Sequence, residues 1–295
     1  MFEPLSPNLS NDQAFLLPES LRVDRSGKFL SWVDIERGTL SRCDLDSGAI
    51  STTFVATNLS FAHPLPGGNF VVAAGSRLGL LSSTGKLSES APLVGETRRF
   101  NDGFVDSFGR LVVGAKNLGN ADGRNPLLVI NPAARVEILD NDLGLSNGIA
   151  CHPVTQELFS VDSEQSIIFI RSVDSRGGFS RRSVFYRFSE WETPDGVAFS
   201  QAGDLYVALW GSGCVVRIGS DGREIERLDV PSPFVTSVVL HPATGDIFVA
   251  TASEEREGFF FQKASGQIWR AKRRTPGLAL NEWNPIDMNE VEPRC

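Results

Sequence analysis

The sequence is poor in the residues that crosslink small secreted domains or build thiolate metal centres. Its four cysteines, Cys43, Cys151, Cys214 and Cys295, are scattered along 295 residues and form no Cys-x-x-Cys pair. We therefore expect neither a disulfide framework nor a zinc thiolate site. A reducing, cytoplasmic setting is the default expectation for such a chain.

Long apolar runs are also lacking. No stretch approaches the roughly 18 apolar residues of a membrane span, and the first 15 residues lack the basic and apolar segments of a signal peptide. Basic residues are outnumbered, with 28 Lys and Arg against 36 Asp and Glu, for a net charge of −8. This acidic balance argues against nucleic acid as a partner. The sequence therefore predicts no membrane or nucleic-acid partner, and it gives no indication of oligomeric state.

Signatures of nucleophilic catalysis are missing as well. No Gly-x-Ser-x-Gly motif occurs, so a serine hydrolase of the usual strand–turn–helix type is not supported. Only three histidines are present, and each of them, His63, His152 and His241, precedes a proline. We interpret the three as repeated turn residues and not as metal ligands or general bases.

The chain does contain a repeated unit, most clearly seen from Thr193 to Asp221. Short runs rich in β-branched and aromatic residues alternate there with turns of Gly, Asp and Ser, and no helical period appears. The triplet Pro194-Asp195-Gly196 that opens the unit has the composition of a turn. The pattern predicts an antiparallel meander of short strands.

The same unit recurs six times. We align the copies on the first apolar residue of the second strand, and successive anchors lie 40 to 47 residues apart. The anchors are Leu30, Phe70, Leu111, Leu158, Leu205 and Ile247. Six meanders at this spacing predict an all-β fold, a six-bladed β-propeller with a central channel, formed by residues 1–295 as a single domain. The alternative, a two-sheet β-sandwich, requires no fixed period.

Other segments carry weaker expectations. Residues 1–18 could add the outer strand of the last blade and so close the ring. The stretches Lys116–Pro126 and Ser253–Gly266 are predicted to be long loops, at least one of them bordering the channel mouth. The acidic tail, Asn281–Cys295, is expected to lie on the surface.

A polar position precedes every anchor by ten or eleven residues. The six residues that share this slot all carry side-chain oxygen, and they are Glu19, Ser60, Asn101, Asn147, Asp195 and Thr236. The slot falls at the start of the first strand of each repeat, and first strands line the channel of a propeller. Two carboxylates and two carboxamides meeting there would supply hard oxygen ligands for one divalent cation. Ca²⁺, Mg²⁺ or Mn²⁺ fits best, while Zn²⁺ and Fe²⁺ also accept carboxylates.

The slot has a simpler interpretation too. Asn147-Gly148 and Asp195-Gly196 are common turn pairs and need no metal to explain them. Glu19 is followed by no glycine and has no turn role, which favours the metal interpretation.

These motifs together carry a family resemblance. The segments Arg99–Gly103, Ser146–Gly148, Pro194–Gly196 and Ser31–Ile35 resemble the SMP-30/gluconolactonase/LRE family of regucalcin-like proteins and sugar lactonases, from Glu19 to about Ala271. The resemblance implies a six-bladed propeller with a metal in its channel and hydrolysis of a sugar (aldono-) lactone. It implies metal ligation by Glu19, Asn147 and Asp195, with Asp195 also the catalytic base. Arg99 and Asn101 would bind substrate.

The sequence departs from the family pattern at three places. Glu19-Ser20-Leu21 replaces a usual Glu-Gly-Pro, and Val238–His241 replaces a Cys-Phe-Gly-Gly pattern. Gly114–Asn117 stands where many members have Gly-Thr-Met followed by a substrate-binding Glu, so Lys116 and Asn117 alter the expected substrate wall. These changes leave the particular lactone open more than the type of reaction.

Two other functions remain open from the sequence. A non-catalytic regulatory propeller would use the same metal ligands. An aryl-ester or organophosphate hydrolase would need the same metal and an apolar pocket, to which the run Phe259-Phe260-Phe261 could contribute. Arg99 has its own simple alternative, a surface ion pair.

Overall fold

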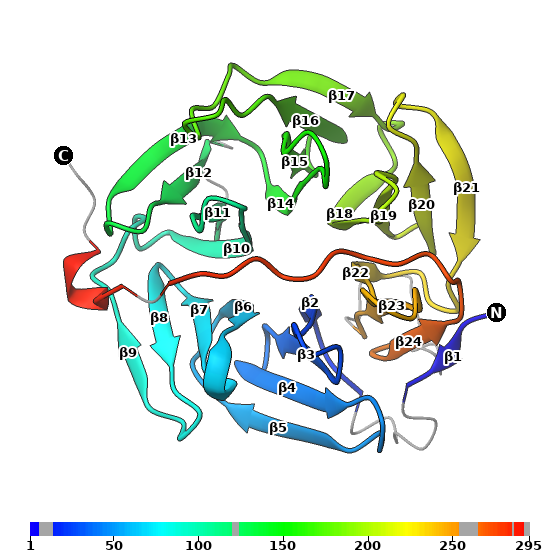
Figure 1. Cartoon of the computed structure of the whole chain (residues 1–295), viewed down its shortest axis with the longest axis horizontal. Coiled ribbons are helices and arrows are strands. Elements are labelled where there is room, and N and C mark those ends of the chain that lie inside the picture. The colour runs from blue at the N-terminus through cyan, green and yellow to red at the C-terminus, as the bar shows by residue number, and fades with distance from the viewer. Residues whose placement is uncertain (6–13, 120–123, 254–264, 285, 292–295) are drawn as a thin grey trace.

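The computed structural model describes residues 1–5, 14–119, 124–253, 265–284 and 286–291. In these ranges the chain forms six antiparallel sheets of four strands each, arranged as the blades of a ring (Figure 1). The predicted six-bladed β-propeller is confirmed, and each of the six anchors lies in the second strand of its blade. None of the helical segments in the same ranges is long and apolar enough to cross a membrane.

Blades one to three follow the chain in order from the channel outward. Blade one consists of β2 (Pro18–Val23), β3 (Phe29–Asp34), β4 (Thr39–Asp44) and β5 (Ile50–Phe54). Blade two consists of β6 (Leu59–Pro64), β7 (Phe70–Ala74), β8 (Arg77–Leu81) and β9 (Leu87–Glu89), with a 3₁₀ turn η2 (Pro66–Gly68). Blade three consists of β10 (Arg98–Val105), β11 (Leu111–Asn117), β12 (Asn125–Ile130) and β13 (Val136–Leu143).

Blades four to six complete the ring. Blade four consists of β14 (Ser146–Cys151), β15 (Leu158–Asp162), β16 (Ile167–Arg171) and β17 (Ser183–Arg187). Blade five consists of β18 (Thr193–Phe199), β19 (Leu205–Trp210), β20 (Cys214–Ile218) and β21 (Glu224–Asp229). Blade six consists of β22 (Val235–Leu240), β23 (Ile247–Thr251), β24 (Ile268–Ala271) and, from the other end of the chain, β1 (Glu3–Pro4).

The N-terminus closes the ring, as the sequence suggested. Glu3 pairs with Arg270 and Pro4 with Trp269, so β1 is the outer strand of blade six (Figure 1). Backbone hydrogen bonds between β1 and β24 therefore join the N-terminal segment of the chain to its last blade.

Apolar side chains fill the space between neighbouring blades. One buried cluster lies between each adjacent pair, for example Leu21 and Trp32 of blade one against Phe248 and Ile268 of blade six. Each meander has a face that it cannot bury alone, and packing blade on blade removes both faces from water. The inner strands are thereby held rigidly around the axis.

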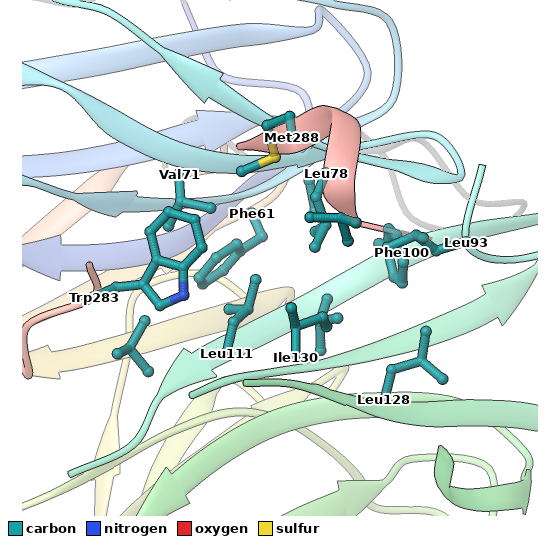
Figure 2. Packing of buried hydrophobic residues seen from close by; sticks show 14 of the residues in the cluster. Phe61, Val71, Leu78, Leu93, Phe100, Leu111, Leu128, Ile130, Trp283 and Met288 are labelled. Atoms are coloured by element: carbon teal, nitrogen blue, oxygen red, sulfur yellow. The ribbon is translucent and has the colours of Figure 1, made fainter. Parts of the chain in front are cut away.

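The C-terminal segment has exposed residues, as the predicted surface tail would, but three of its side chains are buried and anchor it to the ring. After β24 the chain crosses the middle of the ring and ends in the 3₁₀ turn η3 (Met288–Glu290) beside blades two and three (Figure 1). Trp283, Met288 and Val291 are at most 3% exposed and pack among blade-two and blade-three side chains, including Phe61 and Leu78 (Figure 2). We refer to residues 276–284 as the strap.

The first predicted long loop is shorter than expected, and the second lies almost entirely outside the described residues. Lys116 and Asn117 belong to β11, and Asn125 and Pro126 belong to β12, so the first connection is shorter than predicted. In the second, residues 254–264, including Phe259–Phe261, lie outside the described residues.

The strap generates a stability prediction. Trp283 is 2% exposed in the cluster between blades two and three. Truncating a buried Trp leaves a cavity, so Trp283→Ala should lower the free energy of unfolding by about 3–5 kcal/mol in denaturant titrations. Trp191 is 81% exposed, and Trp191→Ala should change that free energy by about 0.5 kcal/mol or less. Equal effects of the two substitutions would show that the strap contributes nothing to the core.

A second prediction concerns pH. His63 is 2% exposed, and its Nε2 hydrogen bonds to the strap at Asn281 O, 3.0 Å away. Burial, and then the charge of Arg22, lowers the pKa of His63 from its usual 6.5 to about 3. Between these two pKa values the unfolded chain binds a proton that the folded protein does not, so stability falls as pH drops from about 6.5 toward 3.

His63→Gln replaces the titrating imidazole with an amide that binds no proton in this pH range. The free energy of unfolding, measured from pH 4 to pH 7, should therefore depend less steeply on pH in the variant than in the wild type. The same slope in both proteins would mean that His63 does not remain neutral in the folded state.

Candidate active site in the propeller channel

All six slot residues lie on the inner strands, one per blade, and each lies in or directly beside an irregularity in strand pairing. The register between first and second strand shifts by one residue at Ser60, Asn101, Asn147, Asp195 and Thr236, and directly after Glu19, which still pairs with Val33. The first strand contributes one extra residue in every case. Such a β-bulge re-aims side chains that would otherwise follow the regular alternation of a strand. The bulges thus repeat around the channel at equivalent positions.

The structure rules out the turn interpretation of the Asn-Gly and Asp-Gly pairs. Asn147-Gly148 lies within β14, and Asp195-Gly196 lies within β18. A Cβ on Gly148 would stand 2.5 Å from the carbonyl oxygen of Asp195, and one on Gly196 would stand 2.8 Å from that of Thr236. Glycine is needed because adjacent inner strands approach closely, and not because the chain turns.

The predicted site residues line one cavity of about 270 Å³. Glu19, Arg99, Asn101, Asn147 and Asp195 all line it. The remaining lining residues are Leu17, Ile35, Glu36, Lys116, Leu145, Thr193 and Trp210. Ring closure therefore brings together, on one wall, residues that are up to 176 positions apart in the sequence.

A chain of hydrogen bonds links blades three, four and five at this cavity. Arg99 Nη1 donates to Asn101 Oδ1 at 2.8 Å, and Asn101 Nδ2 donates to Asn147 Oδ1 at 2.6 Å. Asn147 Nδ2 then donates to Ser163 Oγ at 2.9 Å, and that hydroxyl donates to Pro194 O. Arg99 is 4% exposed, which rules out its alternative as a surface ion pair. The network fixes the orientation of both amides.

Two carboxylates face unfavourable surroundings in the same cavity. Burial, with repulsion from Asp102, raises the pKa of Glu19 to about 8. Burial, followed by repulsion from Glu19 and Asp102, raises the pKa of Asp195 well above its usual value. Asp195 Oδ1 is buried and accepts no hydrogen bond from any described residue. A bound cation would stabilise a buried carboxylate oxygen that accepts no hydrogen bond and lies in the same cavity as a second carboxylate.

The donor set fits a hard divalent cation. Glu19 and Asp195 offer carboxylate oxygens and Asn147 offers an amide oxygen, which are the ligand types of Ca²⁺, Mg²⁺ and Mn²⁺. Within the described ranges no group of three or more His, Cys, Asp and Glu side chains is placed to hold a metal ion. The fit therefore depends on an amide as the third ligand.

Two aspartates at matching positions hold the approach to the slots. Asp34 accepts hydrogen bonds from the amides of Leu16 (2.9 Å) and Leu17 (3.2 Å), just before Glu19. Asp162 accepts from Gly144 (2.9 Å) and Leu145 (3.2 Å), just before Asn147. Each lies four residues after its anchor, so the repeat itself carried a signal that the sequence analysis left unused.

Ser20 explains one departure from the family pattern. It occupies the place of the usual glycine and adopts a left-handed conformation with φ of 56°. Its hydroxyl accepts from Ala62 N at 3.2 Å and donates to Ala62 O at 3.4 Å. These contacts to blade two offset the strain of a non-glycine residue in that conformation.

Sequence reasoning assigned no role to Ser163 or Trp210, and it named Lys116 only as a change in the expected substrate wall. Ser163 orients Asn147, while Trp210 and Lys116 lie on the cavity wall. No local pattern marks these residues. Strand alternation could have placed Lys116, because it lies directly opposite Arg99 in the β10–β11 pair.

The histidines lie away from this cavity. His152 Nδ1 and His241 Nδ1 accept backbone amides two and three residues ahead, at 3.0–3.3 Å, as the predicted turn role requires. His63 differs, since it contacts the strap. It lines a second cavity of about 210 Å³, mostly apolar, between the far ends of the inner strands and strap residues 278–281.

Comparison with known proteins finds lactonases and a regucalcin that are similar to this protein over most of the chain. The chain is 31% identical to a pentonolactonase of Haloferax volcanii, over 78% of this chain and 80% of that protein. It is 28% identical to a 6-deoxy-6-sulfogluconolactonase of Pseudomonas putida, over 85% and 89%. The solved structure of a calcium-binding protein, regucalcin, from Agrobacterium tumefaciens superposes with a TM-score of 0.87 at 21% identity, covering 96% of this chain and 97% of that one.

The family description "SMP-30/Gluconolactonase/LRE-like region" matches residues 17–253, a span that contains every slot residue. The inner-strand bulges and all residues that line the cavity lie within this matched span. The chain belongs to the SMP-30/gluconolactonase/LRE-like family.

Proposed function

We propose that this protein hydrolyses a sugar (aldono-) lactone to its open-chain acid, with one divalent cation held by Glu19, Asn147 and Asp195. The observation that carries the proposal is the buried Asp195 Oδ1, which accepts no hydrogen bond from the described residues and shares its cavity with Glu19. The relatives named as lactonases support the same reaction type.

The identity of the cation follows from ligand chemistry and similarity. Oxygen donors favour Ca²⁺, Mg²⁺ or Mn²⁺, and Zn²⁺ or Fe²⁺ is also compatible with carboxylates. A structural relative is named as a calcium-binding protein, which supports calcium. When bound, such a cation supplies Lewis acidity toward the lactone carbonyl and lowers the pKa of water.

The protein's own residues then have distinct tasks. Asp195 is the proposed general base, because its carboxylate lines the cavity and can accept a proton from water. Arg99 and Asn101 are proposed to bind the substrate, and the 2.8 Å hydrogen bond that Arg99 donates to Asn101 holds both side chains in place before it arrives. Ser163 is a positioning residue that acts through Asn147.

The charged cavity wall favours a sugar lactone over an apolar aryl ester or organophosphate. Four of its lining residues are ionisable groups at or beside the predicted ligands, namely Glu19, Arg99, Lys116 and Asp195.

A cytoplasmic location is also part of the proposal, since the three described cysteines, Cys43, Cys151 and Cys214, are free and buried. Cys295 lies outside the described residues.

The proposal is tested by measuring metal content and turnover together. Purified protein should contain about one divalent ion per chain, and chelation should abolish opening of aldonolactones in a panel that also contains aryl esters. Restoring the ion should restore turnover of the lactones. Metal binding without turnover of any substrate would favour the regulatory alternative, and preference for aryl esters would favour the other hydrolase.

Two substitutions separate ligation from proton transfer. Asp195→Asn keeps an oxygen of similar size but removes a charge and the proton acceptor. Its metal affinity should fall, and kcat should stay about 10²–10⁴-fold low even at saturating metal, as expected for loss of a positioned base. Asn147→Ala should lower metal affinity, but excess metal should restore much of the turnover.

Metal titrations followed by kcat at saturation measure both effects. Full recovery of Asp195→Asn by added metal would show that Asp195 only holds the ion. The general base would then have to be another group.

A further inference from the structure

Two cations face each other on the wall of the cavity. Arg99 in β10 and Lys116 in β11 are direct partners in the antiparallel pair, and both line the cavity. Directly opposed residues project from the same face of a sheet, with Cβ atoms about 4.5–5.5 Å apart. Like charges in this arrangement destabilise a sheet unless other charges compensate.

The carboxylates of the site compensate this pair when no metal ion is bound. Burial raises the pKa values of both Glu19 and Asp195, and the charges of Lys116 and Arg99 partly offset that rise, so the four groups act on one another. Glu36 adds a third carboxylate, exposed at the rim. With all five groups ionised, the net charge of the cavity is −1.

A divalent ion would reverse this balance. Held by Glu19 and Asp195, it would neutralise both carboxylates and bring the net charge of the cavity lining to +1, with Glu36 the remaining carboxylate that acts on Arg99. Arg99 and Lys116 would then give the lining its net positive charge. Arg offers a planar fork of donors and Lys a compact point charge, and both are common partners of carboxylate, sulfonate and phosphate groups.

We propose that Lys116, together with Arg99, binds an anionic substituent of the substrate, so that the enzyme prefers lactones carrying an oxyanion group over neutral lactones. This inference rests on the proposed function and names the substrate class of that same site. Trp210 and Ile35 supply the apolar part of the wall for the carbon skeleton. Lys116 is thus a specificity-determining residue.

A matched pair of lactones tests this preference. D-glucaro-1,4-lactone carries a carboxylate at carbon 6, where D-glucono-1,4-lactone carries a hydroxyl. At saturating metal, the wild-type kcat/KM should be about tenfold to a hundredfold higher for the charged lactone, the range that a charge-assisted contact provides. The ratio should decrease at high salt, because screening weakens the contact.

Three substitutions identify the origin of that ratio. Lys116→Met should bring it close to one, whereas Lys116→Arg should largely keep it. Lys86→Met, in an exposed turn between β8 and β9, should leave the ratio unchanged. A purely structural role for Lys116 would lower kcat/KM for both lactones equally, and an unchanged ratio in Lys116→Met would therefore overturn the proposal. So would a wild-type ratio near one.

Calorimetry keeps the test independent of turnover. Glucarate should bind the metal-loaded wild type about tenfold or more tighter than gluconate, and Lys116→Met should abolish that difference. If no lactone is opened but glucarate is preferred, the proposed function fails while the anion site stands. If lactones are opened but neither assay shows a preference for the charged compound, the anion site fails while the proposed function stands.

Discussion

The site depends on the forced proximity of two buried carboxylates from opposite parts of the chain. Glu19 comes from blade one and Asp195 from blade five. Burial, followed by repulsion from Asp102, raises the pKa of Glu19, and burial, followed by repulsion from Glu19 and Asp102, raises that of Asp195. In a loose structure water would solvate both carboxylates and remove the cost of their burial. The apolar clusters between blades and the pairing of β1 with β24 supply the rigidity that keeps them together. The proposed divalent cation would offset the cost of burying these two carboxylates.

Precision at the site comes from backbone features more than from the ligands themselves. Bulges recur at equivalent places in all six inner strands, and the slot residues of blades one, three, four and five line the cavity. Asp34 and Asp162 hold the segments that lead into two of these slots. The hydrogen bonds that run from Arg99 through Asn101, Asn147 and Ser163 to Pro194 O tie three blades together beside the cavity. Such pre-arranged polar groups pay little reorganisation cost when substrate binds.

The two ends of the channel have different characters. One end holds charged and amide side chains and opens on the proposed substrate cavity. The other end is mostly apolar and is covered by the strap, which His63 and Trp283 help to anchor. Charge is therefore concentrated at a single end, where Lys116 and Arg99 add positive charge to a wall built around carboxylates.

The sequence by itself determined the features that repeat. Local periodicity fixed the meanders, their number and the slot that carries Glu19, Asn147 and Asp195, because each blade is a short-range structure with its own pattern. The positions of residues outside the repeat depend on tertiary contacts that the repeat pattern does not show. The acidic tail proved to be anchored, since Trp283 and Met288 fill a gap between blades that no local pattern describes. The family resemblance had placed Lys116 at the substrate wall, but only the cross-strand register places it opposite Arg99.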